Sequence, residues 1–302
     1  MINKLPFVSI VIARKNEERN IGHCLKSIKL QTYPRAKIEI IVVDNQSTDK
    51  TKEIARKYAH KVFNLPEFLN LTKVKNYRGA QVNFGVKRSK SEIIFFPDAD
   101  MTFDKELIDE AVKLIKEGQL DALYSPEIIV GRGWLGKIRN FERSFYNTTC
   151  IEAVRIMRKK LFFKIDGFDE KKIDFGPDDW DFTKRLKMVT DKISIINSKI
   201  YHHEEKMNLR EYLTKKRKYS TTFAKYIEKW GKDDQDVKRQ LGFWYRYFGV
   251  FIENGKWKKL FRHPILTIGM YFLRIMVGAN FLISSLKKER NKQTPSLNEG
   301  MA

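Results

Sequence analysis

The sequence predicts an α/β fold in which a mostly parallel sheet is flanked by helices. In the first half of the 302-residue chain, short β-branched runs alternate with stretches whose apolar residues recur at helical spacing. The strand-like runs are apolar throughout, which is typical of strands buried on both faces of a parallel sheet. Apolar residues make up 42% of the chain, enough for a sizeable packed core. Ligands bind such sheets at the carboxyl ends of the strands, so residues there are the first candidates for a site.

The alternation starts with an apolar strand at 7–13 and a helix in which Ile21, Cys24, Leu25 and Ile28 share one face. It continues with strands at 38–44, 60–65 and 92–97, and with helices that end near 59, span 74–90 and span 104–117.

The second half is less regular. A segment rich in Arg and aromatic residues precedes an acidic turn region, a helix at 179–189 and a strand that ends in two histidines. From Asn208 onward the pattern is helical, basic and aromatic. We therefore expect a main domain at 1–205, a basic helical extension at 206–286 and a polar, disordered tail at 287–302.

The net charge of +22 is uneven, because the segment from Tyr201 to the C-terminus carries 21 basic and 10 acidic residues. Such a surface suits an anionic partner: a nucleic acid, an anionic membrane or a phosphorylated substrate. The two cysteines form no disulfide framework or CxxC metal motif, so a reducing compartment is expected. The apolar run near the N-terminus is too short for a signal peptide and is interrupted by Arg14.

Two carboxylates, Asp98 and Asp100, follow the apolar run at 92–97. In an extended segment, residues i and i+2 point to the same side. Paired carboxylates suit a hard divalent cation that keeps other positions open for water and phosphate oxygens. A solvated turn or a helix cap is the alternative. Asp44 ends a neighbouring strand, which favours a site shared by these acids.

Four segments at 8–31, 38–51, 78–100 and 167–187 occur in an order and spacing that resemble the family 2 glycosyltransferases. These are inverting enzymes with the Rossmann-like GT-A fold, and the resemblance covers 7–205. It implies a GT-A catalytic domain, a nucleoside diphosphate sugar (UDP or GDP) as donor, and Mn²⁺ or Mg²⁺ as cofactor.

The resemblance also implies a set of donor contacts. Asp44 would accept hydrogen bonds from the nucleobase or ribose, and it could also cap the next helix, which does not exclude that contact. Ala13, Arg14 and Lys15 replace the family's Pro-Thr-Tyr, which leaves the identity of the base open. The residues implied in nucleotide-sugar binding are Ala13, Asn16, Glu17, Asp44, Arg78, Asn83, Asp98 and Ala99. The nearby Gly79 and Gly85 could instead serve close packing.

By the same resemblance, Asp98 lies near the ribose and metal, and Asp100 binds the metal. A divalent ion there offsets the charge that develops on the leaving nucleoside diphosphate. His202 or His203 is a further candidate ligand, since imidazole suits Mn²⁺. Only one of two adjacent strand residues can face the site, and the sequence favours neither.

Asp179 matches the family's catalytic aspartate, the general base that takes the proton from the acceptor hydroxyl. Asp178 and Trp180 would lie on the acceptor side. Neighbouring acids raise one pKa by mutual repulsion, which helps a base. The alternatives are that Asp178 or Asp179 caps the helix that follows and that Trp180 packs in the core.

The stretch 264–286 is long enough to span a bilayer, but Arg274 lies at its middle, where an isolated cation is costly. We therefore favour a helix lying in the plane of an anionic membrane over a spanning one. A solvated basic domain is a further alternative. A nucleic-acid surface is disfavoured because no RNP, helix-turn-helix or zinc pattern is present.

Together these features predict a metal-dependent, inverting glycosyltransferase, peripheral or monotopic at the cytoplasmic face of the cell membrane. Its acceptor would be a hydroxyl of a lipid-linked or envelope glycan. One alternative is transfer to polyprenyl phosphate, for which Asp179 would be dispensable. The non-enzyme alternative is a membrane or nucleic-acid binding protein with a degenerate GT-A core. The oligomeric state stays open.

Overall fold

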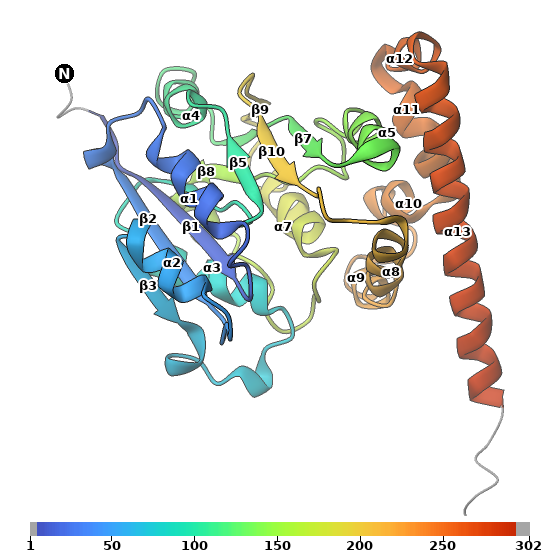
Figure 1. Cartoon of the computed structure of the whole chain (residues 1–302), viewed down its shortest axis with the longest axis horizontal. Coiled ribbons are helices and arrows are strands. Elements are labelled where there is room, and N and C mark those ends of the chain that lie inside the picture. Colours follow the sequence, from blue (N-terminus) through green and yellow to red (C-terminus); the bar gives the residue numbers. More distant parts are fainter. Residues whose placement is uncertain (1–4, 294–302) are drawn as a thin grey trace, which may run out of the picture.

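The computed structural model describes residues 5–293 and has the predicted mixed α/β architecture (Figure 1). The strands of its main sheet lie in the order β3 (Lys61–Asn64), β2 (Ile38–Asp44), β1 (Val8–Arg14), β4 (Ile93–Phe95), β8 (Ile156–Arg158), β6 (Ala122–Tyr124) and β9 (Ile193–Ile195). Neighbouring strands are parallel except at β8, which runs antiparallel to both β4 and β6. The sheet is therefore mostly parallel.

A second, smaller sheet consists of β5 (Met101–Phe103), β10 (Ile200–His203) and β7 (Glu127–Val130). The central β10 is antiparallel to β5 and parallel to β7. Because β5 begins directly after Asp100, the segment with the two carboxylates connects the two sheets. A single bridge between Ala13 and Asp98 fixes this segment at the end of β1.

The helices of the first half are α1 (Ile21–Lys29), α2 (Thr51–Tyr58), α3 (Tyr77–Arg88) and α4 (Leu107–Lys116), with short 3-10 turns at Arg35–Lys37, Leu65–Glu67 and Leu71–Lys73. Alternate residues of β1 belong to two hydrophobic clusters, as the two faces of a strand require. Ile10 and Ile12 pack with α1 and α4, whereas Val11 packs with α3. Helices thus cover both faces, which explains the continuous apolar strands.

The two glycines of α3 serve close packing. A Cβ at Gly85 would lie 2.4 Å from Val11 Cγ1, and one at Gly79 would lie 2.8 Å from Phe168 Cβ. Any larger residue would push α3 away from β1 or from the 167–170 loop.

The helices of the second half are α5 (Gly133–Arg143), α6 (Lys159–Lys164), α7 (Asp178–Lys187), α8 (Leu209–Ser220), α9 (Phe223–Trp230), α10 (Gln235–Leu241), a π-helical turn (Tyr245–Gly249), α11 (Val250–Ile252), a 3-10 turn (Glu253–Gly255), α12 (Trp257–Arg262) and α13 (Pro264–Gln293). Figure 1 shows α8, α9 and α10 between the sheets and the long α13. The predicted tail at 287–302 begins inside α13, and its part from 294 onward lies outside the described residues.

The extension shares a hydrophobic cluster with the main domain. Phe141 and Phe145 pack with Val250, Phe251 and Met270. As a result, α13 has one face against the protein and one face in solvent.

The buried face of α13 holds Arg274, which is 6% exposed. Arg274 Nη2 forms an ion pair with Glu142 Oε1 at 2.9 Å. On the opposite face, exposed large apolar side chains follow helical spacing: Ile265, Ile268, Phe272, Ile275 and Leu282, between 62% and 71% exposed. We call these five residues the α13 stripe. By length and composition, Pro264–Leu282 could cross a membrane.

Candidate functional site

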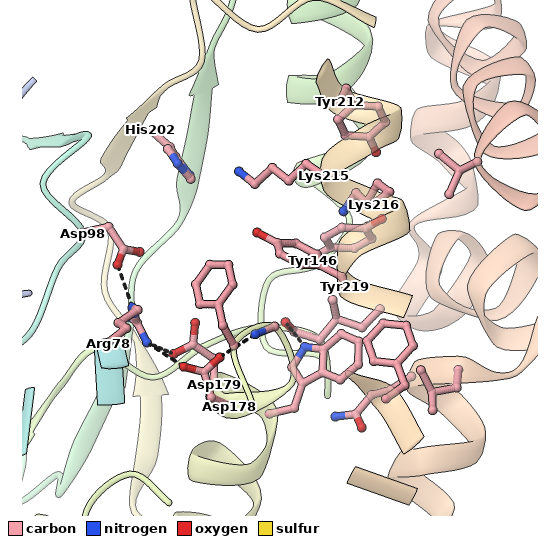
Figure 2. A pocket seen from close by; sticks show the side chains of 18 of the residues that line it. Arg78, Asp98, Tyr146, Asp178, Asp179, His202, Tyr212, Lys215, Lys216 and Tyr219 are labelled. Carbon is pink, nitrogen blue, oxygen red and sulfur yellow. Dashed lines mark hydrogen bonds and ion pairs between the residues drawn. The ribbon is translucent and has the colours of Figure 1, made fainter. Parts of the chain in front are cut away.

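A cavity of about 630 Å³ opens beside the carboxyl end of β1 and extends toward α8 and α13 (Figure 2). It brings together most of the residues that the sequence predicts: Ala13, Glu17, Arg78, Asp98, Asp100, Asp178, Asp179, Trp180 and His202. Arg14 and Lys15, which replace the family's usual residues, also line it. The carboxylates of Asp98 and Asp100, which follow β4, therefore face the same space as those of Asp178 and Asp179 at the start of α7.

Asp44 and Asn16, both predicted to contact the nucleotide, form hydrogen bonds with the turn after β2. Asp44 is fully buried, and its carboxylate accepts hydrogen bonds from the Ser47 backbone N–H at 2.9 Å and from the Ser47 hydroxyl. Asn16 Oδ1 accepts from the Thr48 N–H at 2.9 Å. Neither residue lines the cavity. Asp44 does not cap α2 either, because the N-cap residue of that helix is Lys50, and its contact with the nucleotide stays a prediction.

The structure places Asn83 and Ala99 outside the lining of the cavity. Asn83 exchanges two hydrogen bonds with the Phe168 backbone, at 2.8 and 2.9 Å, and donates a third to Glu170. Its side chain therefore fixes the 167–170 loop against α3. Ala99 is fully buried in the core, because it points opposite to its neighbours Asp98 and Asp100.

The strand pleat also separates the two histidines. His202 lines the cavity. His203 points away and hydrogen bonds to Thr102 Oγ1 at 2.9 Å and to Glu205 Oε1 at 2.7 Å. His203 therefore lies outside the cavity, and His202 is the candidate metal ligand of the pair.

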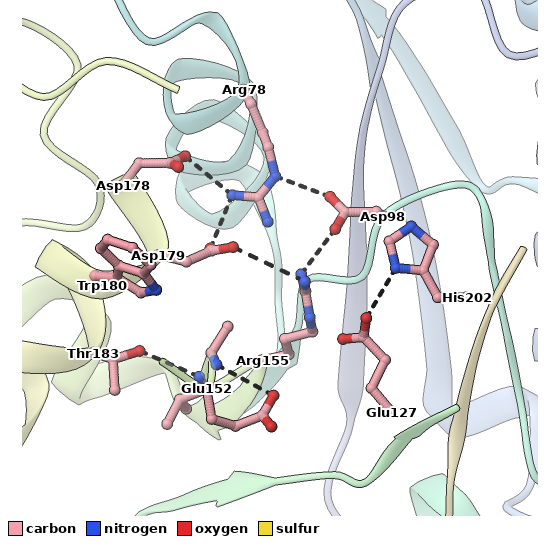
Figure 3. A network of polar contacts seen from close by, with 12 residues as sticks. Arg78, Asp98, Glu127, Glu152, Arg155, Asp178, Asp179, Trp180, Thr183 and His202 are labelled. Carbon is pink, nitrogen blue, oxygen red and sulfur yellow. Dashed lines mark hydrogen bonds and ion pairs between the residues drawn. The ribbon is translucent and has the colours of Figure 1, made fainter. Parts of the chain in front are cut away.

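Two arginines bind the carboxylates on one wall of the cavity (Figure 3). Arg78 reaches Asp98 through Nε at 2.9 Å, and Asp179 and Asp178 through Nη1 at 3.1 and 3.3 Å. Arg155 Nη1 lies 3.0 Å from Asp98 Oδ2, and its Nη2 lies 3.9 Å from Asp179 Oδ2. Burial alone would raise the pKa of Asp98, but these arginines hold it well below its usual range. Asp98 is therefore an anion with both oxygens occupied.

The acidic segment at the start of α7 separates into a buried and an accessible carboxylate. Asp178 is 3% exposed and accepts hydrogen bonds from Gly176 N and Asn76 Nδ2 at 3.0 and 3.2 Å. Burial and the neighbouring Asp179 raise the pKa of Asp178 to about 6. The side chain of Asp179 is 24% exposed and lines the cavity. The N-cap position belongs to Pro177, so neither acid caps the helix by the predicted side-chain bond.

Trp180 both packs and lines the cavity. Its Nε1 donates to Ile151 O at 3.2 Å, and its ring stacks on Phe223 with 5.7 Å between centroids. The core-packing alternative therefore holds for one part of this side chain, and the other part faces the cavity.

Asp100 and His202 fit a cation. Asp100 Oδ1 is buried and has no hydrogen-bond partner, and Oδ2 lies 3.2 Å from His202 Nε2. Burial would lower the pKa of His202, but Asp100 and Glu127 together raise it to about 10, so the local field favours positive charge. Among residues 5–293, no three His, Cys, Asp or Glu side chains form a ready metal cage. The protein would thus supply two ligands and leave the rest to oxygens of a bound molecule.

Several residues of the cavity could not be predicted from the sequence. Arg155 lies in an irregular segment before β8, and its role depends on the antiparallel pairing that places it beside Phe96. Four further residues line the α8 end of the cavity: Tyr212, Lys215, Lys216 and Tyr219. From the sequence they were predicted only to form part of a basic and aromatic surface.

Comparison with known protein families identifies two matching regions. The family described as Glycosyl transferase family 2 matches residues 9–168. The family described as N-terminal domain of galactosyltransferase matches residues 135–206. The first match covers more than half of the chain and includes Arg78, Asp98, Asp100 and Arg155.

Curated relatives match over part of their length. Glycosyltransferase AglE of Haloferax volcanii is 37% identical over 121 residues, 40% of this chain and 39% of AglE. Poly(ribitol-phosphate) beta-N-acetylglucosaminyltransferase TarS of Staphylococcus aureus is 26% identical over 211 residues, 66% of this chain and 35% of TarS. The chain therefore spans little more than a third of the length of these relatives.

Two solved structures share the fold over nearly the whole chain. S. aureus TarS 1-349 in complex with UDP-GlcNAc superposes with a TM-score of 0.55 and 20% identity, covering 91% of this chain and 89% of that one. Mannosyltransferase PcManGT from Pyrobaculum calidifontis, in complex with GDP-Man and Mn²⁺, gives a TM-score of 0.61 and 17% identity, covering 93% and 88%. The likeness confirms the predicted GT-A fold.

Proposed function

Because the chain belongs to glycosyl transferase family 2, we propose that it transfers a sugar from a nucleoside diphosphate donor to an acceptor hydroxyl with inversion. The acceptor is a lipid-linked or envelope glycan. The observation that carries this proposal is the single cavity in which Asp179 and the Asp98–Asp100 segment face one another.

Asp179 acts as the general base. As the acceptor oxygen attacks the anomeric carbon, the carboxylate takes the hydroxyl proton. Arg78 Nη1 lies 3.1 Å from one oxygen of Asp179, and Arg155 Nη2 lies 3.9 Å from the other, so the two arginines orient the group. Asp178, buried behind it, positions Arg78 through a contact of 3.3 Å.

Asp100 and His202 would hold a divalent cation, Mn²⁺ or Mg²⁺. When bound, such an ion supplies positive charge that offsets the charge on the leaving nucleoside diphosphate. The unpartnered Oδ1 of Asp100 supports this assignment, as does the Mn²⁺ in the PcManGT structure. Asp98 contributes its charge through the arginines.

The relatives support a nucleotide-sugar donor and leave its base open. The TarS structure contains UDP-GlcNAc, and the PcManGT structure contains GDP-Man. Other relatives are a poly(ribitol-phosphate) beta-glucosyltransferase and a beta-monoglucosyldiacylglycerol synthase, whose names contain a phosphate polymer and a lipid. Both UDP and GDP sugars therefore belong in the first tests.

The protein functions at the cytoplasmic face of the cell membrane, with α13 in the plane of an anionic bilayer. Arg274, which argued against a spanning helix, points into the protein and pairs with Glu142. The α13 stripe faces outward, and the exposed Trp244 and Trp257 have the chemistry of the membrane interface. Since one face of α13 packs on α5 and α8, lipid cannot surround this helix.

Asp179→Asn tests the proposed chemistry, with Asp174→Asn as a matched control outside the cavity. We expect transfer of labelled sugar to a lipid extract of the source organism to fall by about 10²- to 10⁴-fold in Asp179→Asn only. Nucleotide binding should stay unchanged in both variants.

Undiminished transfer in Asp179→Asn would favour polyprenyl phosphate as the acceptor, because that acceptor is already anionic. Absence of transfer by the unaltered protein with every donor, together with metal-independent lipid binding, would favour the non-enzyme alternative.

A further inference from the structure

We call the half of the cavity that lies away from the strand ends the chamber. Its walls come from α5, α8, the turn at Tyr245–Gly249 and α13. Figure 2 shows Lys215, Lys216, Tyr146 and Tyr212 on this side, across from Asp98 and His202. None of these four residues takes part in the chemistry proposed above.

Glu142, which lines the chamber, and the nearby Glu204 are already paired with cations. Glu142 accepts from Arg139 at 2.8 Å and from Tyr146 at 2.7 Å, and it pairs with Arg274 at 2.9 Å. Glu204 lies 3.5 Å from Arg139 and 3.8 Å from Lys215.

Two further basic side chains of the chamber form no ion pair with a carboxylate. Within the part of the chain that the structure describes, neither Lys216 nor Arg246 has a carboxylate oxygen within 4.0 Å. Arg246 Nη1 is buried without a hydrogen-bond partner. Burial, and then Arg139, lower the pKa of Lys216 to about 7, which shows how costly its charge is there. Unmatched cations in an enclosed space are stabilised when an anion binds.

An apolar wall leads from these cations to the surface. Phe243, Tyr247, Val277 and Phe281 line the same cavity. Phe243 stacks on Tyr247 with 4.5 Å between centroids and is 58% exposed, so the wall continues to the outside of the molecule. There it meets the exposed Trp244. The chamber thus joins a cationic interior to an apolar mouth.

We propose that this chamber binds the phosphate or diphosphate headgroup of a lipid-linked acceptor between Lys216 and Arg246. The hydrocarbon chain lies along Phe243, Tyr247 and Phe281 and leaves toward the membrane. The sugar attached to the headgroup then extends toward Asp179. The role as an acceptor site rests on the proposed function, but headgroup binding does not.

Binding of farnesyl diphosphate, measured by calorimetry, tests the proposal, with farnesol and inorganic pyrophosphate as comparisons. A saturating nucleoside diphosphate with Mn²⁺ is present to block the donor end. We expect farnesyl diphosphate to bind at least about tenfold more tightly than either comparison, since each lacks one of the two interactions. Lys216→Gln and Arg246→Gln should each abolish the advantage over farnesol. Lys218→Gln, which removes an exposed charge from the same helix, should retain it.

The proposal is overturned if farnesol binds as well as farnesyl diphosphate, or if Lys216→Gln and Arg246→Gln bind like the unaltered protein. Equal binding of pyrophosphate would also overturn it, by assigning the site to free phosphates. Nucleotide binding is recorded for every variant. Failure of the nucleotide to bind would count against the proposed function alone, and unchanged nucleotide binding would show that the variants are folded.

Discussion

Arg78 and Arg155 determine which carboxylates of the cavity remain free to bind a ligand. Both oxygens of Asp98 are bound by arginines, at 2.9 and 3.0 Å. Asp100 keeps one oxygen free of hydrogen bonds. Asp98 is therefore occupied and Asp100 is available for a ligand, because the two arginines, which lie on other elements, bind Asp98.

Arg155→Gln should lower the free energy of unfolding by about 3 kcal/mol, because Asp98 loses one partner in a buried ion-pair network. Urea denaturation measures the change. The control is Lys160→Gln, an exposed cation nearby, which should change stability by less than about 0.5 kcal/mol. Equal stability of the two variants would contradict a structural role for Arg155.

Lys216 should make the free energy of unfolding rise with pH. Its pKa in the folded protein is about 7, below the ordinary 10.5, because burial and the facing Arg139, Arg246 and Lys215 outweigh Glu142. Between these two values the unfolded chain binds more protons, so the contribution of Lys216 to stability rises with pH.

Lys216→Gln should therefore be more stable than the unaltered protein at pH 6.5, with an advantage that shrinks as the pH rises toward 10. Urea denaturation at several pH values follows this difference. A constant difference across the range would show that Lys216 keeps an ordinary pKa.

Side-chain direction limited what the sequence could predict at single residues. Ala99 and His203 match the family's motifs as letters, but the alternation of a strand points them away from the cavity. Asn83 could not be placed without the loop that it binds. His202 and Asp179, by contrast, both line the cavity.

Among the helices and strands, the sequence-based prediction succeeded where a segment carries a single strong hydrophobic pattern. The apolar runs at 38–44 and at 7–13 became β2 and β1, and the apolar face of α1 is buried as expected. The sequence did not reveal the second sheet or the direction of β8, because strands of three residues carry no periodicity. Nor did it show that α13 turns Arg274 inward, since apolar residues occupy both of its faces.

The α13 stripe predicts a membrane-binding element. Ile268→Glu combined with Phe272→Glu should weaken binding to vesicles of phosphatidylcholine and phosphatidylglycerol by about tenfold or more, because burial of two large side chains is lost. Leu30→Glu combined with Met188→Glu is the matched control, since these side chains are 59% and 70% exposed elsewhere. Sedimentation with vesicles measures both. Equal loss in both variants would remove α13 from the membrane-binding surface.

For the whole molecule, the main domain and the extension build one cavity. The strand ends supply Asp98 and Asp100, α7 supplies Asp179, and α8 and α13 close the far side. The sequence predicted a main domain and an extension, but not their shared chamber. Packing among α5, α8 and α13 joins segments that are distant in the chain, and no local pattern encodes such contacts.

The most direct test of this account is a calorimetric titration of UDP and GDP, with Mn²⁺ and with EDTA. It is carried out on the unaltered protein, on Asp100→Asn and on Asp109→Asn, an exposed control on α4. We expect one nucleotide to bind only with the metal, and we expect Asp100→Asn alone to abolish this binding. No binding of either nucleotide, or binding that EDTA and Asp100→Asn leave unchanged, would contradict it.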